Sequence, residues 1–316
     1  MADDRVDGGV ALARRVRDRL RVGPGRVDLD AIDARATPGL PDDAPRERKP
    51  WSRAEVQRIG ADLAAHQERL YASGVSGDRR RVLLVLQAMD CGGKDGTIKS
   101  VVRALDPQGV RITAFGPPTE RERAQHFLWR INRQLPPAGL VGVFNRSHYE
   151  DVLAARVRAL VPERVWRARY DEINRFERDL VADGLTIIKV MLHISEAEQR
   201  DRLLARLEDP TKRWKFRAGD LEDRERWREY QAAYADALGR CSTDEAPWYV
   251  VPADRKWYRN WAVANLLLAH LDELRLEYPA GEPDLPRFVR RLNGPPAGEP
   301  SAGEPSDLGE RQVNSG

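Results

Sequence analysis

The stretch from residue 82 to residue 100 constrains the fold more than any other part of the sequence. It begins with an apolar run, VLLVLQAM (82–89), continues as DCGGKDGT (90–97) and passes into a helical pattern. A buried strand, a glycine-rich turn, a lysine and a helix together are typical of a phosphate loop, in which backbone N–H groups and the helix N-terminus hold an anion. The sequence therefore predicts an α/β protein with a phosphate site. Its expected phosphate-binding residues are Gly92, Gly93, Lys94, Asp95, Gly96 and Thr97.

The loop departs from the pattern G-x-x-x-x-G-K-[ST] at two positions. Ala88 stands where the first Gly belongs, and Asp95 stands where Ser or Thr belongs. Because a hydroxyl at that place would bind Mg²⁺, we expect carboxylates to hold the metal instead, with Asp90 and Asp95 as candidates. The structural alternative is a glycine turn that only allows a strand and a helix to pack closely.

Short apolar runs alternate with longer amphipathic stretches through the middle of the chain, which is typical of helices around a mostly parallel sheet. The expected strands are 82–89, 110–115, 140–144, 185–194 and 248–253. The expected helices are 52–72, 96–105, 120–134, 165–182, 195–207, 218–238 and 256–274. Five parallel strands suit one three-layer α/β/α domain.

We place this domain at residues 49–279. Residues 1–48 are rich in Arg, Asp, Pro and Gly, so we expect an extended arm there. Residues 280–316 contain AGEP three times, a composition that cannot bury a core, so we expect a disordered low-complexity tail.

The composition excludes several classes of protein. Lys and Arg total 53 against 50 Asp and Glu, and a formal net charge of +3 argues against a nucleic-acid-binding surface. The sequence has two cysteines, and neither belongs to a C-x-x-C pair, so we expect neither a disulfide framework nor a structural zinc site. The first twenty residues lack the apolar core of a signal peptide, and no run has the length of a membrane span. We therefore expect a cytoplasmic protein without membrane contact.

A second polar cluster, NRSHYED (145–151), follows the apolar run at 140–144. Since parallel strands present their carboxyl ends at one edge, this cluster should face the same crevice as Lys94. Arg146 could hold a phosphate through two hydrogen bonds, and Asn145 and Glu150 are candidates for contacts with a metal or an acceptor. The alternative is that these polar residues cap and begin the next helix.

The segment DPTKRWKF (209–216) combines basic and aromatic side chains and holds two of the seven lysines. We expect a lid at about 206–220 that closes over phosphates and adds positive charge. Its expected phosphate contacts are Lys212, Arg213 and Lys215. The alternative is an exposed polar loop with the aromatic residues packed beneath it.

Six blocks in this order and spacing resemble the polyphosphate kinase 2 family: AMDCGGKDGTIK, DPQG, HFLWR, NRSHYEDVL, DPTKRWKF and APWYVVPADRKW. The resemblance extends from about residue 51 to residue 279. It implies a P-loop kinase fold like that of thymidylate kinase, with a helical lid. It also implies reversible transfer of the terminal phosphate of inorganic polyphosphate to AMP, ADP or both.

The resemblance also implies particular roles. Catalytic roles fall to Asp90, Lys94, Arg146 and Arg206. Metal ligands are expected at Asp90, Asn145 and Glu150. Many members carry Asp at the position of Asn145, and the Asn version with a nearby Glu resembles the branch that accepts both mono- and diphosphates. The nucleotide-contacting residues are therefore Asn145 and Glu150.

The implied cofactor is Mg²⁺, with Mn²⁺ as a substitute, and the implied partners are polyphosphate and adenine nucleotides, with guanine as an alternative base. A long polyphosphate needs a basic track beyond one phosphate site, which arginines around the lid, together with Arg156 and Arg158, could supply. We expect a homodimer or homotetramer. Two other functions stay open: an ATP-dependent nucleoside monophosphate kinase, and a non-enzymatic polyanion-binding module.

Overall fold

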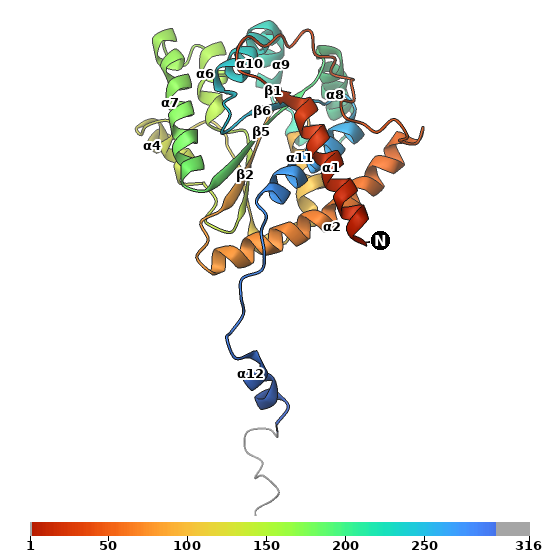
Figure 1. The fold of residues 1–316 in the computed structure, drawn as a ribbon. Coiled ribbons are helices and arrows are strands. Elements are labelled where there is room, and N and C mark those ends of the chain that lie inside the picture. The colour runs from red at the N-terminus through yellow and green to blue at the C-terminus, as the bar shows by residue number, and fades with distance from the viewer. Residues whose placement is uncertain (1, 295–316) are drawn as a thin grey trace, which may run out of the picture. The chain divides into compact units, whose positions relative to one another are not determined.

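A six-stranded sheet lies between two layers of helices in the computed structural model, which describes residues 2–294 (Figure 1). The strands are β1 (Arg21–Val22), β2 (Arg81–Gln87), β3 (Val110–Ala114), β4 (Val141–Asn145), β5 (Leu185–His193) and β6 (Trp248–Pro252). The α-helices are α1 (Ala2–Leu20), α2 (Arg48–Val75), α3 (Lys94–Val101), α4 (Glu120–Arg123), α5 (Trp129–Asn132), α6 (Ala154–Val157), α7 (Glu163–Ala182), α8 (Glu196–Glu208), α9 (Gly219–Glu225), α10 (Trp227–Cys241), α11 (Lys256–Glu273) and α12 (Leu285–Leu292). The 3₁₀ turns are η1 (Val102–Ala104), η2 (Pro107–Gly109), η3 (His148–Asp151) and η4 (Arg213–Lys215).

The strand order is β1-β6-β5-β2-β4-β3, and β2 to β6 run parallel to their neighbours in the sheet. The expectation of five parallel strands is thus confirmed. The sheet has a sixth strand that we did not expect, because β1 pairs antiparallel with β6 through only two residues. Chain order reverses at β2, which lies between β4 and β5. In open α/β sheets this switch point is where ligands bind, at the carboxyl ends of the strands.

The apolar run of β2 is explained by burial on both faces. Leu84 and Leu86 join a cluster with α1, α2 and α11, whereas Leu83 and Val85 join a cluster with α7 on the opposite face. Successive side chains of a strand point to opposite faces, so a strand covered on both sides has no polar alternation. Figure 1 shows these two layers, with α7 on one side of the sheet and α2 and α11 on the other.

The N-terminal arm is not extended throughout, contrary to our expectation for residues 1–48. Residues 2–20 form α1, and Ala13, Val16 and Leu20 are buried against α11. Their spacing is helical, and it places one apolar stripe on the core. Sequence reasoning missed the helix because arginines and aspartates occupy most of the other positions.

Two expected helices are each divided in the structure. The stretch 120–134 contains α4 and α5, separated by a turn, and α4 buries none of its residues. The stretch 218–238 begins in α9 and continues in α10 after a break at Arg226. The expected helical lid at 206–220 therefore consists of the end of α8, the single turn η4 and the start of α9.

The chain divides into two units, the first ending at Tyr278 and the second beginning at Pro279. In the second unit we expected a disordered tail at 280–316, but Leu285–Leu292 forms α12. Its exposed apolar residues are Leu285, Phe288, Val289 and Leu292, which share one side of the helix. The rest of that expected tail, residues 295–316, lies outside the described residues.

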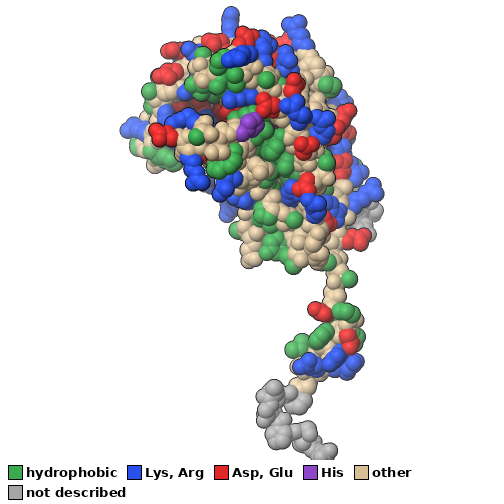
Figure 2. All heavy atoms as spheres, turned by 90° about the vertical axis from the view of Figure 1, so that its left-hand side faces the viewer, with side chains coloured by type: hydrophobic (Ala, Val, Ile, Leu, Met, Phe, Trp, Pro, Cys, Tyr) green, Lys and Arg blue, Asp and Glu red, His purple; other side chains and the backbone are tan. Residues whose placement is uncertain are grey.

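The face of the described chain seen in Figure 2 agrees with a near-neutral composition. On the face seen in Figure 2, basic and acidic side chains lie interspersed, without a continuous field of one sign. Between residues 2 and 294, no helix is both long enough and apolar enough to cross a membrane.

A buried ion pair joins α7 to the sheet. Lys189 of β5 has no exposed surface, and its Nζ donates to Glu177 Oε2 at 2.5 Å and to the Tyr149 hydroxyl at 3.0 Å. Glu177 Oε1 also accepts from the Tyr149 hydroxyl at 2.9 Å and lies 3.1 Å from a ring nitrogen of His148. Burial raises the pKa of Glu177, but the charges and bonds of Lys189 and His148 outweigh it, so that pKa lies below its ordinary value. The pair therefore fixes the turn η3, which follows β4.

We predict that Glu177→Gln lowers the free energy of unfolding at pH 7 by about 3–5 kcal/mol, because Lys189 is left as a buried charge without its counterion. The pKa of Glu177 in the folded protein lies below the ordinary 4.5. The stability it adds is thus present above pH 4.5 and is lost as pH falls through the lower folded pKa. Urea unfolding at pH 7 and near pH 3 measures both effects, and the variant should show the shallower acid dependence.

The control is Glu163→Gln, which removes a carboxylate from an exposed pair with Arg167 in the same helix. Such an exposed pair contributes about 0–1 kcal/mol to the free energy of unfolding. Equal losses in the two variants would contradict the role of the buried pair.

Candidate active site

The turn between β2 and α3 requires glycine at two positions. Gly93 has φ of 105°, and a Cβ there would lie 1.8 Å from Nη1 of Arg259. A Cβ on Gly92 would lie 2.4 Å from the Cβ of Ala88, the residue that replaces the first Gly of the usual pattern. The neighbouring Cys91 also has a left-handed backbone, with φ of 61°. Close packing on both sides of the turn therefore holds its N–H groups in one arrangement.

Lys94 begins α3 and is buried beside this turn. Its Nζ donates to the carbonyl of Ala88 at 2.9 Å. Burial lowers the pKa of Lys94, as does the charge of Arg146, while the carboxylates of Asp90 and Glu150 act in the opposite direction. A bound phosphate would supply the counterion that this lysine needs, and the N-terminus of α3 adds its own positive potential.

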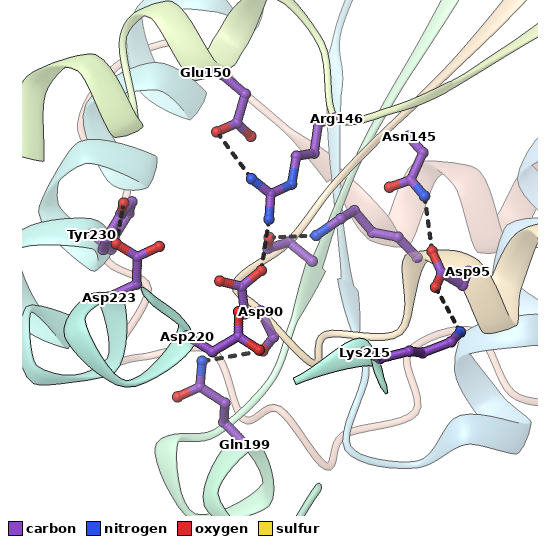
Figure 3. A network of polar contacts seen from close by, with 12 residues as sticks. Asp90, Asp95, Asn145, Arg146, Glu150, Gln199, Lys215, Asp220, Asp223 and Tyr230 are labelled. Carbon is purple, nitrogen blue, oxygen red and sulfur yellow. Dashed lines mark hydrogen bonds and ion pairs between the residues drawn. The ribbon is translucent and has the colours of Figure 1, made fainter. Parts of the chain in front are cut away.

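Arg146 follows β4 directly and lies over the phosphate loop. Its backbone N–H donates to the carbonyl of Leu86 at 3.0 Å, and its φ of 64° is left-handed, a strain of about 1–3 kcal/mol typical of functional sites. Its guanidinium lies 2.8 Å from Asp90 Oδ1 and 3.9 Å from Glu150 Oε2 (Figure 3). The charge of Glu150 raises the pKa of Arg146, burial lowers it, and Asp90 helps to keep it above the ordinary value.

Glu150 is largely buried behind Arg146. Burial raises its pKa, although the charges of Arg146 and Lys94 lower it. Two cations and two carboxylates thus meet at the carboxyl ends of β2 and β4, as the sequence predicted for Asp90, Lys94, Arg146 and Glu150.

Asp95 connects the loop to the lid. Its Oδ1 accepts from Asn145 Nδ2 at 2.9 Å, and its Oδ2 accepts from Lys215 Nζ at 3.2 Å (Figure 3). Burial raises the pKa of Asp95, but these bonds and the charges of Lys215 and Lys94 lower it more, so the pKa lies below its ordinary value. The lid therefore contacts the phosphate loop through an ion pair.

Arg206 reaches the same region from the end of α8. Its Nη1 lies 3.2 Å from Asp220 Oδ2. Burial raises the pKa of Asp220, and so does the negative charge of Asp90. Gln199, which has no motif to reveal it, donates to the backbone carbonyl of Asp90 at 3.1 Å.

Three of the expected phosphate contacts point elsewhere. Lys212 pairs with Asp209 at 2.5 Å, and Arg213 donates to the carbonyl of Leu207 at 2.7 Å, so both engage the lid itself. Thr97 is fully buried and donates to the carbonyl of Gly93 at 3.2 Å. Their phosphate contacts stay predictions.

Two arginines that support the loop were not among the expected site residues. Arg202 of α8 donates to the carbonyls of Cys91 and Gly92 at 3.0 and 3.2 Å. Arg259 of α11 packs on Gly93. The available signal for Arg259 was its position, soon after the carboxyl end of a parallel strand.

A divalent cation fits the donor set at this site. Asp90 and Glu150, two of the expected ligands, place carboxylates 2.8 and 3.9 Å from the guanidinium of Arg146. In residues 2–294 there is no group of three or more His, Cys, Asp and Glu arranged to hold a metal. Mg²⁺ in phosphoryl transfer takes one or two carboxylates and completes its shell with water and substrate phosphates. The site thus suits a metal that arrives with its substrate.

A hollow of about 620 Å³ opens where α9 meets α10. Its lining consists of Glu196, Leu221 and residues 224–229, and includes none of the expected site residues. The chemistry is therefore assigned to the loop edge of the sheet and not to this hollow.

A family model described as Polyphosphate kinase 2 matches residues 47–278. The chain belongs to the polyphosphate kinase 2 family. It is 55% identical over 267 residues to the AMP/ADP-polyphosphate phosphotransferase of Meiothermus ruber, covering 84% of this chain and 96% of that one. It is 40% identical over 278 residues to the ADP-polyphosphate phosphotransferase of Rhodopseudomonas palustris, covering 84% and 93%.

A crystal structure of polyphosphate kinase 2 from Arthrobacter aurescens has the same fold, with a TM-score of 0.84 and 46% identity over 89% of this chain and 97% of that one. The family resemblance and the P-loop-type α/β fold expected from the sequence are therefore confirmed. The protein is a transferase.

We predict that Gly93→Ala lowers kcat/KM for phosphate transfer about 100-fold, because the added Cβ displaces either the loop or Arg259. Gly77→Ala is the matched control: Gly77 has φ of 94°, but nothing lies within 4 Å of its Cβ position. Both variants should lose about 1–2 kcal/mol of stability from the left-handed backbone. Kinetics and thermal unfolding measure the two effects, and equal activity in both variants would contradict the role of the Gly93 contact.

Proposed function

We propose that this protein transfers the terminal phosphate of inorganic polyphosphate to AMP and to ADP, reversibly. The observation that carries the proposal is the meeting of Lys94, Arg146 and Asp90 at the phosphate loop, in a chain of this family. The Meiothermus ruber relative, named for transfer with both AMP and ADP, supports the two acceptors.

Such a reaction brings two polyanions together, so the site must first offset their repulsion and then hold them in line. Holding the reactants in line can supply about 7–11 kcal/mol of the barrier. Lys94 and Arg146 would hold the phosphates where the polyphosphate meets the nucleotide. Arg206 would add positive charge from the lid side. The acceptor oxygen is already anionic, so no general base is needed.

Enzymes of this family require a divalent metal in general, and we infer Mg²⁺, with Mn²⁺ as a substitute. When bound, it neutralises charge on the phosphates. Asp90, Asn145 and Glu150 would hold it. The lid, which Lys215 brings into contact with the phosphate loop, would help to exclude water while the phosphate moves.

The alternative is an ATP-dependent nucleoside monophosphate kinase with the same fold. The two functions differ in the phosphate donor. To distinguish them, the protein is incubated with Mg²⁺, long-chain polyphosphate and either AMP or ADP, in the absence of ATP. Chromatography should then detect ADP and ATP as products. Turnover of AMP with ATP alone would overturn the polyphosphate assignment.

We further infer that the protein is cytoplasmic, forms a homodimer or homotetramer, and does not bind nucleic acid. Its acceptors would be adenine nucleotides, with guanine nucleotides as an alternative. Sedimentation tests the oligomeric state, and the same assay with GDP tests the use of guanine nucleotides.

We predict that Lys94→Ala reduces transfer at least about 100-fold with little loss of fold, because the lysine supplies charge where charge moves. Lys99→Ala, an exposed lysine in the last turn of the same helix, is the control and should keep its activity. Circular dichroism checks the fold of both. Full activity of the Lys94 variant would refute the site.

We predict that Asn145→Asp changes the ratio of kcat/KM for AMP and ADP by about fivefold, the effect of roughly 1 kcal/mol. Asn145 donates to Asp95, and a carboxylate in its place would repel Asp95 unless a cation joined them. The variant should therefore bind Mg²⁺ more tightly and reach half-maximal activity at a lower Mg²⁺ concentration. Asn132→Asp, an exposed change in α5, is the control. An unchanged ratio of kcat/KM for AMP and ADP at every Mg²⁺ concentration would contradict a role of Asn145 in acceptor preference.

A further inference from the structure

Consecutive carbonyls of the phosphate loop accept hydrogen bonds from one helix, α8. Gln199 donates through Nε2 to the carbonyl of Asp90 at 3.1 Å. Arg202 donates to the carbonyls of Cys91 and Gly92 at 3.0 and 3.2 Å. The two side chains are three residues apart and therefore lie on the same side of α8. Because the C=O and N–H of a trans peptide point in opposite directions, the N–H groups of these peptides are turned away from α8.

The backbone between these bonds is strained. Cys91 has φ of 61°, a left-handed conformation that a residue with a Cβ adopts only at a cost in free energy. Gln199 holds the carbonyl of the peptide before Cys91, and Arg202 holds the carbonyl after it. If the first bond is lost, Cys91 can return to a negative φ by turning the peptide that joins it to Asp90. The bond from Gln199 thus opposes a rearrangement directly beside Asp90.

The orientation of this peptide matters because Asp90 is part of the site. Its Oδ1 lies 2.8 Å from the guanidinium of Arg146, and it is an expected metal ligand. A displacement of about 1 Å of a group that orients reactants can cost about 100-fold in rate. Gln199 contacts the backbone of Asp90 and not its carboxylate, so its effect on the reaction is exerted through Asp90 (Figure 3).

The amide of Gln199 is itself held in one orientation. The side chain has no exposed surface, and its Oε1 accepts from Nη1 of Arg224 at 3.0 Å. The same nitrogen of Arg224 donates to the carbonyl of Glu196 at 2.8 Å. A guanidinium has only donors, so the oxygen of the amide must face Arg224, which leaves the NH₂ group for the carbonyl of Asp90. Arg224 belongs to α9, the helix that follows the lid.

We propose that Gln199 is a positioning residue for phosphate transfer, which holds the peptide between Asp90 and Cys91 in place, and that Arg224 orients its amide. The inference rests on the proposed function in taking phosphate transfer as the reaction, but it is independent of the phosphate donor. It also connects α9 to the phosphate loop through one continuous chain of hydrogen bonds.

The first test compares Gln199→Met with Gln67→Met in the full-length protein. Gln67 is a matched control: it is 1% exposed, and its Oε1 accepts from the backbone N–H of Asp106 at 3.0 Å, so it also holds a turn from a buried position. Both variants should shift the midpoint of urea unfolding by similar amounts. Only Gln199→Met should lower kcat, by about tenfold, with each KM changed less than about twofold, because the lost bond aligns the loop for transfer.

The second test repeats Gln199→Met in a Cys91→Gly background. Glycine adopts the left-handed conformation without the cost that a Cβ brings, so the loop no longer needs to be held against relaxation. The loss in kcat should therefore shrink from about tenfold to about twofold or threefold, a coupling that a double-mutant cycle measures. A side chain that only stabilises the protein would give the same loss in both backgrounds.

Arg224→Met tests the orientation of the amide. Gln199 keeps its own donor in this variant but loses the partner that fixes its direction, so kcat should fall by a smaller factor, about threefold. Arg228→Met is the control, since Arg228 lines the same hollow as Arg224 and should leave kcat unchanged.

Equal kcat for Gln199→Met and Gln67→Met overturns the inference, and so does an undiminished loss in the Cys91→Gly background. Turnover of polyphosphate by the wild-type protein keeps the proposed function in either case. A wild-type protein that uses ATP but no polyphosphate overturns the proposed function instead, and the same variants then test Gln199 with ATP and AMP.

Discussion

The pairing of β2 between β4 and β5 is the constraint on which the rest of the structure depends. Its register aligns Leu86 with Asn145, so the turn after β2 and the turn after β4 end side by side. Burial on both faces holds β2 in that register, since a slip by one residue would exchange the two apolar faces. The turns that carry Lys94 and Arg146 thereby form one site, although they are far apart in the sequence.

The site balances its charges locally and not through the net charge of the chain. Arg146 is held between Asp90 and Glu150, and Asp95 is held between Asn145 and Lys215. These pairs keep cations at fixed places in the absence of substrate, which is the preorganisation that electrostatic catalysis needs. Behind them, the Lys189–Glu177 pair supports η3 and is too deeply buried to take part in the chemistry.

The sequence predicted the parallel sheet and the meeting of Lys94 and Arg146 at its carboxyl edge because both follow from short segments. An apolar run buried on two faces and a glycine-rich turn are local patterns, and the carboxyl-edge rule then brings Lys94 and Arg146 together. Contacts between distant segments were not predictable in this way. The apolar stripe of α1 is diluted by charge, and Arg259 acquires its role only when α11 packs on Gly93. The hydrogen bonds between Arg158 and Asp223 are likewise fixed by tertiary packing.

The ion pair between Lys215 and Asp95 has a consequence for the order of events at the loop. Lys215 already pairs with Asp95. In the proposed reaction an incoming phosphate would therefore exchange with a carboxylate at Lys215 and would not meet a bare cation. Such an exchange would leave the number of close ion pairs at Lys215 unchanged and would release Asp95 as a free anion in the first turn of α3. After transfer that carboxylate would compete for the lysine again, and the lid contact itself would then favour departure of the product.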